Sequence, residues 1–224
     1  MGRKKISREK IIQAFLSSCF DKSAGGTSLS DVADSLEIKK ASLYNHFKSR
    51  EDMYNETIVF CGREVSTVGF IAEKTFDSIN KNNILPVNLF KKLITRYFEF
   101  YENEPLLQMY AFLYTEQFYN DDVLEIVKRE RKRLEDSIKK ILDAFLETKK
   151  FGEKSEKDLL ECSICISSQI LDKLQTYIVM RKSLVRKNPE TGAGSLFSLP
   201  TDDFALNSSI KNVEFILKEF LNNG

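Results

Sequence analysis

The chain has 224 residues, of which 42% are hydrophobic and 30% charged, with a net charge of +1. This balance is typical of a globular protein rather than of a disordered or membrane chain. No apolar run approaches the roughly 18 residues that a membrane span needs, and the charged start Arg3-Lys4-Lys5 lacks the apolar core of a secretory signal. We therefore expect a cytoplasmic protein that has no membrane partner.

The charge is unevenly distributed along the chain. Residues 1–50 carry ten Lys and Arg against five Asp and Glu, a net charge of +5, whereas the remaining residues carry 24 against 28, a net charge of −4. A basic module attached to a mildly acidic body is typical of a protein that meets a polyanion at one end. Chance clustering is the alternative interpretation of the charge pattern taken alone.

Apolar residues recur at spacings of three and four along most of the chain, which predicts an all-α fold. Nine helices are expected, at about 7–21, 28–36, 40–47, 49–80, 87–103, 105–118, 121–150, 153–187 and 203–222. Pro86 and Pro105 fall in first turns, where proline is tolerated, and Gly152 marks a joint. The composition of residues 188–201 predicts a long loop.

The first three helices have the spacing of a helix-turn-helix unit. Ser28 can cap the second helix by accepting from the amide near Asp31, and Ser49 can cap the fourth. Only the three residues 37–39 separate the second helix from the third. In this arrangement the second element of the motif enters the major groove of DNA. We therefore divide the chain into a DNA-binding domain, 1–52, and a second domain, 53–224.

The third helix supplies the candidate recognition surface. Leu43 and Phe47 lie one turn apart and are expected to face the core, which puts Ala41 and Asn45 on the opposite face. Asparagine can pair bidentately with adenine, and a small residue permits close approach. Ser42 and Tyr44 flank this face and can bond to bases or phosphates. The remaining phosphate candidates are Lys39, Lys40, His46 and Lys48.

Two segments resemble the signature of the TetR family of transcription regulators: Thr27-Ser28-Leu29-Ser30-Asp31-Val32-Ala33, and Ala41-Ser42-Leu43-Tyr44-Asn45-His46-Phe47-Lys48-Ser49-Arg50-Glu51. The resemblance covers about residues 8–55. It implies phosphate contacts from Tyr44, His46 and Lys48, and from Thr27 or Ser28. It also implies a homodimer formed through the helices at about 153–187 and 203–222, and a pocket for an unknown small-molecule effector among the middle helices. The candidate pocket residues are Tyr110, Tyr114, Gln169, Lys173 and Tyr177.

The chain departs from the family pattern at two positions. Glu37 occupies the place in the turn that the family usually gives to glycine, so a left-handed backbone there would cost about 1–2 kcal/mol. Lys39 occupies the place of the Ser or Thr that usually caps the third helix. We expect that helix to lack its cap and to be less rigid in the absence of DNA.

Several alternatives stay open at this point. The tyrosines, glutamine and lysine assigned to the pocket can equally be packing residues, and His46 can be an ordinary surface residue. Arg3, Lys4, Lys5 and Arg8 form either a flexible basic arm or a solvated tail. Cys19 and Cys61 are expected to be reduced thiols, as are Cys162 and Cys165, whose CxxC spacing lacks the second pair or histidines of a zinc site.

The functional prediction is a repressor that a small molecule releases from its operator, with no cofactor, no metal and no catalytic residues. An enzyme is disfavoured because the sequence shows no nucleophile–His–carboxylate set, phosphate loop or metal-ligand cluster. An activator or a ligand-independent DNA-binding protein of the same fold remains an alternative. A helical interaction protein that does not bind DNA is another.

Overall fold

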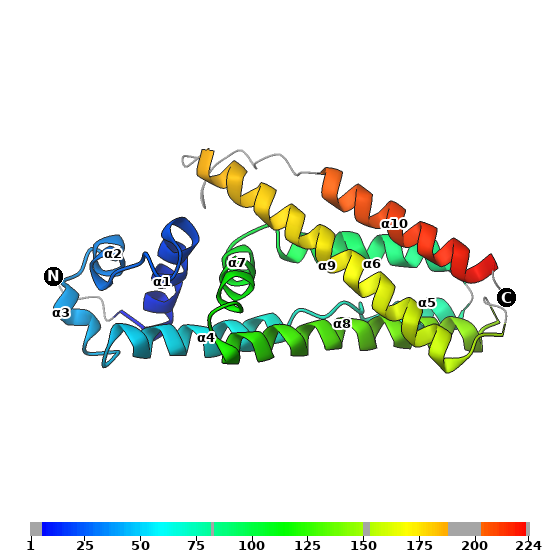
Figure 1. Ribbon diagram of the computed structural model, residues 1–224, viewed down its shortest axis with the longest axis horizontal. Coiled ribbons are helices and arrows are strands. Elements are labelled where there is room, and N and C mark those ends of the chain that lie inside the picture. The colour runs from blue at the N-terminus through cyan, green and yellow to red at the C-terminus, as the bar shows by residue number, and fades with distance from the viewer. Residues whose placement is uncertain (1–5, 82, 150–152, 188–202, 223–224) are drawn as a thin grey trace. The chain divides into compact units, whose positions relative to one another are not determined.

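The computed structural model describes residues 6–81, 83–149, 153–187 and 203–222, and the regular structure in these ranges is entirely helical. The ten helices are α1 (Arg8–Lys22), α2 (Leu29–Ser35), α3 (Lys40–Leu43), α4 (Arg50–Ser66), α5 (Thr75–Asn80), α6 (Pro86–Phe100), α7 (Leu106–Glu116), α8 (Asp121–Glu147), α9 (Glu156–Lys187) and α10 (Asp203–Asn222). Figure 1 shows them in chain order. The predicted all-α class is confirmed. The loop predicted at 188–201 and the joint at Gly152 lie outside the described residues.

The chain packs as two compact units. The first unit comprises Met1–Thr67 and Asn103–Val127, and the second comprises Val68–Glu102 and Lys128–Gly224. Helix α8 starts in the first unit and continues in the second. The division predicted after residue 52 separates a DNA-binding domain from the rest of the chain, and it stays a prediction. The packing units do not follow it, because α7 and the start of α8 pack with the N-terminal helices.

The count of nine helices was wrong for the described residues, because the helix expected over 49–80 is two helices. Helix α4 ends at Ser66, and α5 begins at Thr75. The carbonyl groups between them bond to side chains: Arg133 Nη2 donates to Val68 O at 2.9 Å, and Arg96 Nη1 donates to Gly69 O and Phe70 O at 3.1 Å each. Because these donors replace the amides of a continuing helix, the break is stabilised by contacts that a local sequence pattern cannot show.

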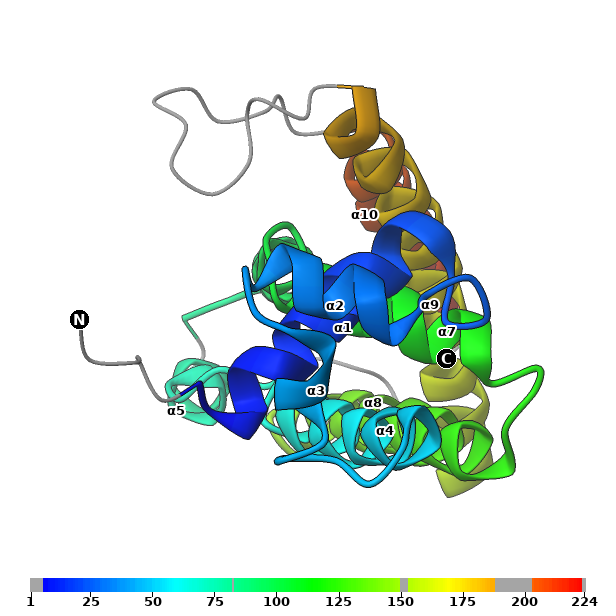
Figure 2. The same ribbon diagram turned by 90° about the vertical axis from the view of Figure 1, so that its left-hand side faces the viewer.

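The first unit has a continuous hydrophobic core beneath the helix-turn-helix motif, whose helices α1, α2 and α3 are labelled in Figure 2. Leu43 and Phe47 are 1% and 2% exposed, which confirms that they face inward. Helix α7 adds Met109 and Phe112 to the same core, and the ring of Phe112 lies edge-on to Tyr54 of α4 at 5.9 Å between centroids. The motif therefore rests on a support that includes residues distant in sequence.

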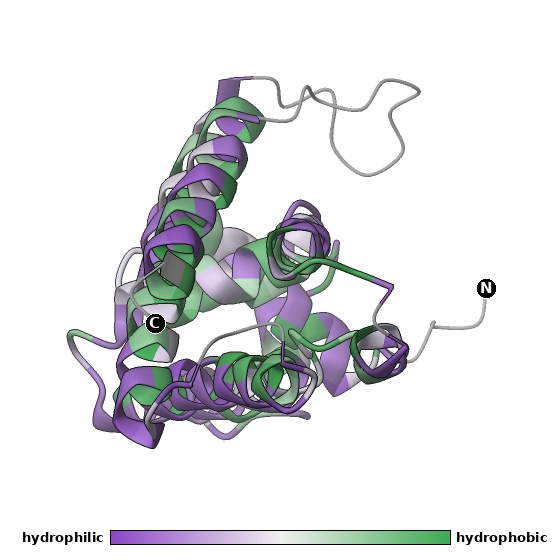
Figure 3. Ribbon diagram, turned by 90° about the vertical axis from the view of Figure 1, so that its right-hand side faces the viewer, coloured by the Kyte–Doolittle hydropathy of each residue, from purple (hydrophilic) through white to green (hydrophobic). Residues whose placement is uncertain are grey.

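In the second unit, α10 packs against α9 and α6. Figure 1 shows α9 and α10 side by side, and hydrophobic and hydrophilic residues alternate along them in Figure 3. The ring of Tyr177 on α9 is buried against Phe98 on α6, with 5.4 Å between centroids. Large hydrophobic side chains also remain exposed on α9 and α10, namely Leu160, Ile164, Val179, Met180, Phe204 and Phe215. These two helices therefore have apolar surface beyond what the unit itself buries.

Candidate nucleic-acid interface

The start of α2 is fixed by a reciprocal cap. Ser28 Oγ accepts from the Asp31 amide at 3.2 Å, and Asp31 Oδ2 accepts from the Ser28 amide and hydroxyl at 2.7 Å each. The predicted cap is therefore confirmed, and it is a complete capping box. Lys22 pairs with the same carboxylate, and the hydrogen bonds from Lys22 and Ser28 hold the pKa of Asp31 well below its usual range.

The turn after α2 contains a left-handed residue. Glu37 has a φ of 54°, and its amide donates to Asp34 O at 3.1 Å. The amide of Ile38 donates to Ala33 O at 3.0 Å, which closes the end of α2. The conformation expected at a glycine position is thus present here with a glutamate, at a cost of about 1–2 kcal/mol.

The variant Glu37→Gly should raise the free energy of unfolding by about 1 kcal/mol, because glycine adopts the left-handed region without strain. Urea denaturation followed by circular dichroism measures the change. Asp34→Gly is the matched control, since Asp34 lies within α2, where glycine should instead destabilise the protein by about 1 kcal/mol. Equal destabilisation by both substitutions would contradict the assignment of strain to Glu37.

Helix α3 is shorter than the expected 40–47. It ends at Leu43, and residues 44–46 form turns in which the amides of His46 and Phe47 bond to Leu43 O at 2.9 and 3.0 Å. Lys39 is the N-cap and makes no side-chain capping bond, as expected from the missing Ser or Thr. The missing cap lies at the start of α3, which begins at Lys40 as predicted, and the turns after Leu43 still carry Phe47 into the core.

Most predicted DNA contacts lie at the surface. Tyr44 is 53% exposed, and Ser42 and His46 are half-buried. The exposed side chains at the remaining predicted positions are Ser28, Lys39, Lys40, Ala41, Asn45 and Lys48. Because Leu43 and Phe47 anchor this segment from the inner side, the structure brings the candidates of α3 and the following turn together on its outer side. We call Ala41, Tyr44 and Asn45 the recognition surface.

Thr27 is the exception among the predicted contacts. Its side chain is 2% exposed, and its hydroxyl donates to Ser23 O at 2.8 Å. The placement of the Thr27 side chain at the DNA surface is therefore corrected, because the hydroxyl is used inside the first unit. Ser28 keeps the exposed position at the start of α2.

Arg50 is a positioning residue that the sequence interpretation missed. Its Nε donates to Thr27 O at 2.8 Å, and its Nη2 donates to Ala24 O. The guanidinium also lies over the ring of Phe15, 5.8 Å from the centroid. Arg50 thus joins the start of α4 to the segment that leads into α2. Its place after the capping Ser49 suggested only a helix start, and nothing local pointed to these carbonyl partners.

Arg8 does not belong to a free basic arm. It lies in α1, pairs with Glu56 of α4 and places its guanidinium 4.8 Å from the centroid of the Phe47 ring. The two alternatives predicted for Arg8, a flexible basic arm and a solvated tail, are therefore both wrong. Arg3, Lys4 and Lys5 lie outside the described residues.

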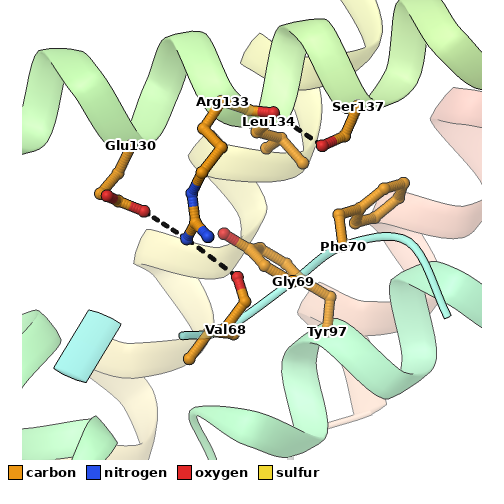
Figure 4. A pocket seen from close by; sticks show the side chains of 8 residues that line it. All are labelled: Val68, Gly69, Phe70, Tyr97, Glu130, Arg133, Leu134 and Ser137. Carbon is orange, nitrogen blue, oxygen red and sulfur yellow. Dashed lines mark hydrogen bonds and ion pairs between the residues drawn. The ribbon is translucent and has the colours of Figure 1, made fainter. Parts of the chain in front are cut away.

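The five candidate pocket residues are divided between the two units. Tyr110 and Tyr114 lie on α7 in the first unit, where their rings stack with 6.0 Å between centroids. Gln169, Lys173 and Tyr177 lie on α9 in the second unit; Lys173 pairs with Asp172 at 2.9 Å, and Tyr177 is 1% exposed. None of the five residues lines either of two hollows that described residues of the second unit form, one beside Phe70 and Arg133 (Figure 4) and one beside Asn88 and Arg96. The assignment of these residues to a pocket stays a prediction.

The four cysteines are free thiols. Burial raises the pKa of Cys19 and of Cys162 to about 12, whereas Cys165 is exposed. In the described ranges, no three His, Cys, Asp or Glu side chains cluster in a way that suits a metal ion. Among the helices in those ranges, none has the length and apolar character needed to cross a bilayer.

A capped helix, a left-handed turn and a short exposed helix over a buried first helix together define a helix-turn-helix unit. Residues 11–57 match the model of bacterial regulatory proteins of the tetR family. A stretch of 54 residues is 41% identical to IcaR of Staphylococcus aureus (strain Newman), described as the HTH-type negative transcriptional regulator of the biofilm operon icaADBC. That stretch is 24% of this chain, and the chain spans only 29% of that regulator.

Solved structures extend the likeness over nearly the whole chain. A TetR transcription regulator from Haloarcula marismortui has a TM-score of 0.60 at 11% identity, covering 96% of this chain and 97% of that one. SmeT, the repressor of the Stenotrophomonas maltophilia multidrug efflux pump SmeDEF, has a TM-score of 0.58 at 12% identity, covering 98% and 93%. The resemblance to the TetR family is confirmed over residues 11–57, which match the model of that family, and the fold of the chain is similar to the folds of solved TetR-family regulators.

Proposed function

We propose that this protein is a sequence-specific DNA-binding transcriptional regulator, acting as a repressor that a small molecule releases from its operator. The observation that carries the proposal is the recognition surface, in which Ala41, Tyr44 and Asn45 are exposed opposite the buried anchors Leu43 and Phe47. The sign of regulation is supported by IcaR and SmeT, described as a negative regulator and a repressor.

The proposal includes a homodimer that joins through the helices at about 153–187 and 203–222. The exposed apolar side chains of α9 and α10 support it, because apolar surface that a subunit leaves uncovered is typical of an association site. Two recognition surfaces related by a two-fold axis would read half-sites about 34–36 Å apart. A dimer therefore explains how a four-residue α3 achieves specificity.

The test is fluorescence anisotropy with DNA from the region flanking the gene of this protein, titrated with salt and with a scrambled duplex. We expect binding at a site of two half-sites, and a steep decrease of affinity with salt, because lysine contacts to phosphate release counterions. The same affinity for the scrambled duplex would argue against sequence-specific regulation from that site.

A transcription assay on the bound promoter separates the repressor from an activator of the same fold. We expect transcription to fall when the protein is added. A rise would replace the repressor with an activator and leave the DNA-binding proposal in place. Dissociation of the DNA complex on addition of a small molecule would identify the effector through the coupling of the two binding sites.

A further inference from the structure

The recognition surface is carried by a segment with little regular structure of its own. Helix α3 has four residues, its N-cap Lys39 makes no side-chain capping bond, and residues 44–46 after it form turns. A helix this short is not stable in water unless it packs against other elements. The positions of Tyr44 and Asn45 therefore depend on the contacts that other helices make with this segment.

One side chain of α1 covers the anchor at the end of the segment. The guanidinium of Arg8 lies 4.8 Å from the centroid of the Phe47 ring, and its Nη2 donates to Glu56 Oε1 of α4. Phe47 is 2% exposed, whereas the Arg8 side chain is 50% exposed, so the guanidinium lies on the solvent side of the ring. Arg8 thus connects three parts of the first unit: α1, α4 and the turn after α3.

Helix α1 itself does not explain an arginine at this position. Arg8 is the first residue of α1, where the partial positive charge of the helix dipole disfavours a cation. Exposed ion pairs and exposed cation–π contacts are each weak, so Arg8 adds little to the stability of the whole unit. Together, however, the two contacts hold the guanidinium over Phe47, and their effect is concentrated on the turn that ends there.

We propose that Arg8 is a positioning residue for DNA recognition. Paired with Glu56 and lying over Phe47, it fixes the turn after α3 and thereby the directions in which Tyr44 and Asn45 point. The inference rests on the proposed function, to which it adds a residue that determines specificity without reading a base.

A direct contact with a DNA phosphate is the other use that an exposed guanidinium can have. The two roles predict opposite effects of Glu56. As the partner of a positioning residue, Glu56 supports DNA binding, and its removal weakens the operator complex. If Arg8 instead bound a phosphate, the carboxylate would compete with the DNA for the guanidinium, and its removal would strengthen binding to any duplex. Glu56 is therefore the position that separates the two roles.

The first test is fluorescence anisotropy of the full chain on operator and scrambled duplexes. We expect Arg8→Ala and Glu56→Ala each to lower the ratio of operator affinity to scrambled affinity about tenfold, because two weak contacts are lost in each of two subunits. The salt slope should stay unchanged. Glu56→Gln keeps an oxygen that can accept from Arg8 and should stay within about twofold of the unmodified chain. Lys10→Ala, the control, removes an exposed charge of α1 that pairs with no described residue and should leave the ratio unchanged.

The second test measures the turn without DNA by amide hydrogen exchange. The amides of His46 and Phe47 both donate to one carbonyl oxygen, at 2.9 and 3.0 Å. Arg8→Ala should speed their exchange about fivefold, because the turn opens more often once the guanidinium no longer covers the ring. The amide of Asp31, which is bonded within the capping box of α2, should exchange at the same rate as before.

The proposal is overturned if Glu56→Ala strengthens binding to both duplexes while Arg8→Ala lowers the salt slope, since Arg8 would then be a phosphate contact. It is also overturned if Arg8→Ala changes neither the affinity ratio nor the exchange of the two turn amides. Unchanged exchange in a chain that still prefers its operator would reject this role of Arg8 alone. Equal affinity of the unmodified chain for both duplexes would reject the proposed function and this role with it.

Discussion

Replacing Arg50 with alanine should lower the free energy of unfolding by about 3 kcal/mol and reduce operator affinity at least tenfold. The substitution leaves the carbonyl groups of Ala24 and Thr27 without their charged donor, and a bond of this kind contributes about 1.5–3 kcal/mol. It also removes the guanidinium from the ring of Phe15. The segment that leads into α2 is then no longer linked to α4. The position of Ser28 relative to the recognition surface should therefore no longer be fixed.

Urea denaturation and anisotropy on the operator measure these two effects. Arg63→Ala is the matched control on the same helix, since that side chain is 66% exposed, pairs with its neighbour Glu64 and, like Arg50, lies over a phenylalanine ring, 5.1 Å from the centroid of Phe60, but donates to no distant carbonyl group that is described. Its effect on stability should stay at or below about 1 kcal/mol, the contribution of an exposed ion pair and an exposed cation–π contact. Arg50→Lys keeps the charge but not the planar fork of donors, so we expect it to recover less than half of the stability that alanine removes. If Arg50→Ala changed neither the free energy of unfolding nor the operator affinity, Arg50 would not be a positioning residue.

The sequence predicted the features of the fold that depend on local chemistry. The cap at Ser28 needs a hydroxyl three residues before an amide, and the inward faces of Leu43 and Phe47 need only helical spacing. A left-handed backbone at Glu37 followed from the family pattern only as a condition, and it is present at φ 54°. Each of these features depends on residues only a few positions apart, so the local sequence is enough to predict it.

The features that the sequence did not predict depend on partners far along the chain. The break after Ser66 is stabilised by Arg96 and Arg133, which lie 26 to 65 residues away from the carbonyl groups that they bond. The buried position of Thr27 and the role of Arg50 likewise arise from contacts between α1, α4 and the segment joining α1 to α2. Helical periodicity gives the direction of a side chain but not its partner, so these positions required coordinates.

Asn45→Ala should weaken binding to the operator by about 30-fold or more and leave binding to scrambled DNA unchanged. The side chain is exposed on the recognition surface, and asparagine can accept from and donate to one adenine edge. Such a bidentate contact contributes about 1–3 kcal/mol of discrimination, and a dimer makes it twice. Anisotropy on operator and scrambled duplexes at one salt concentration measures both affinities.

Lys48→Ala is the informative comparison, because a phosphate contact should behave in the opposite way. Its exposed ammonium carries charge but reads no base, so the substitution should weaken binding to both duplexes by the same factor. The slope of log affinity against log salt should fall by about one for each lysine–phosphate pair that the substitution removes. If Asn45→Ala instead weakened both duplexes equally and changed the salt slope, Asn45 would bind the DNA backbone. The bases would then have to be read by Ala41 on α3, by Tyr44 in the turn after it, or by their neighbours.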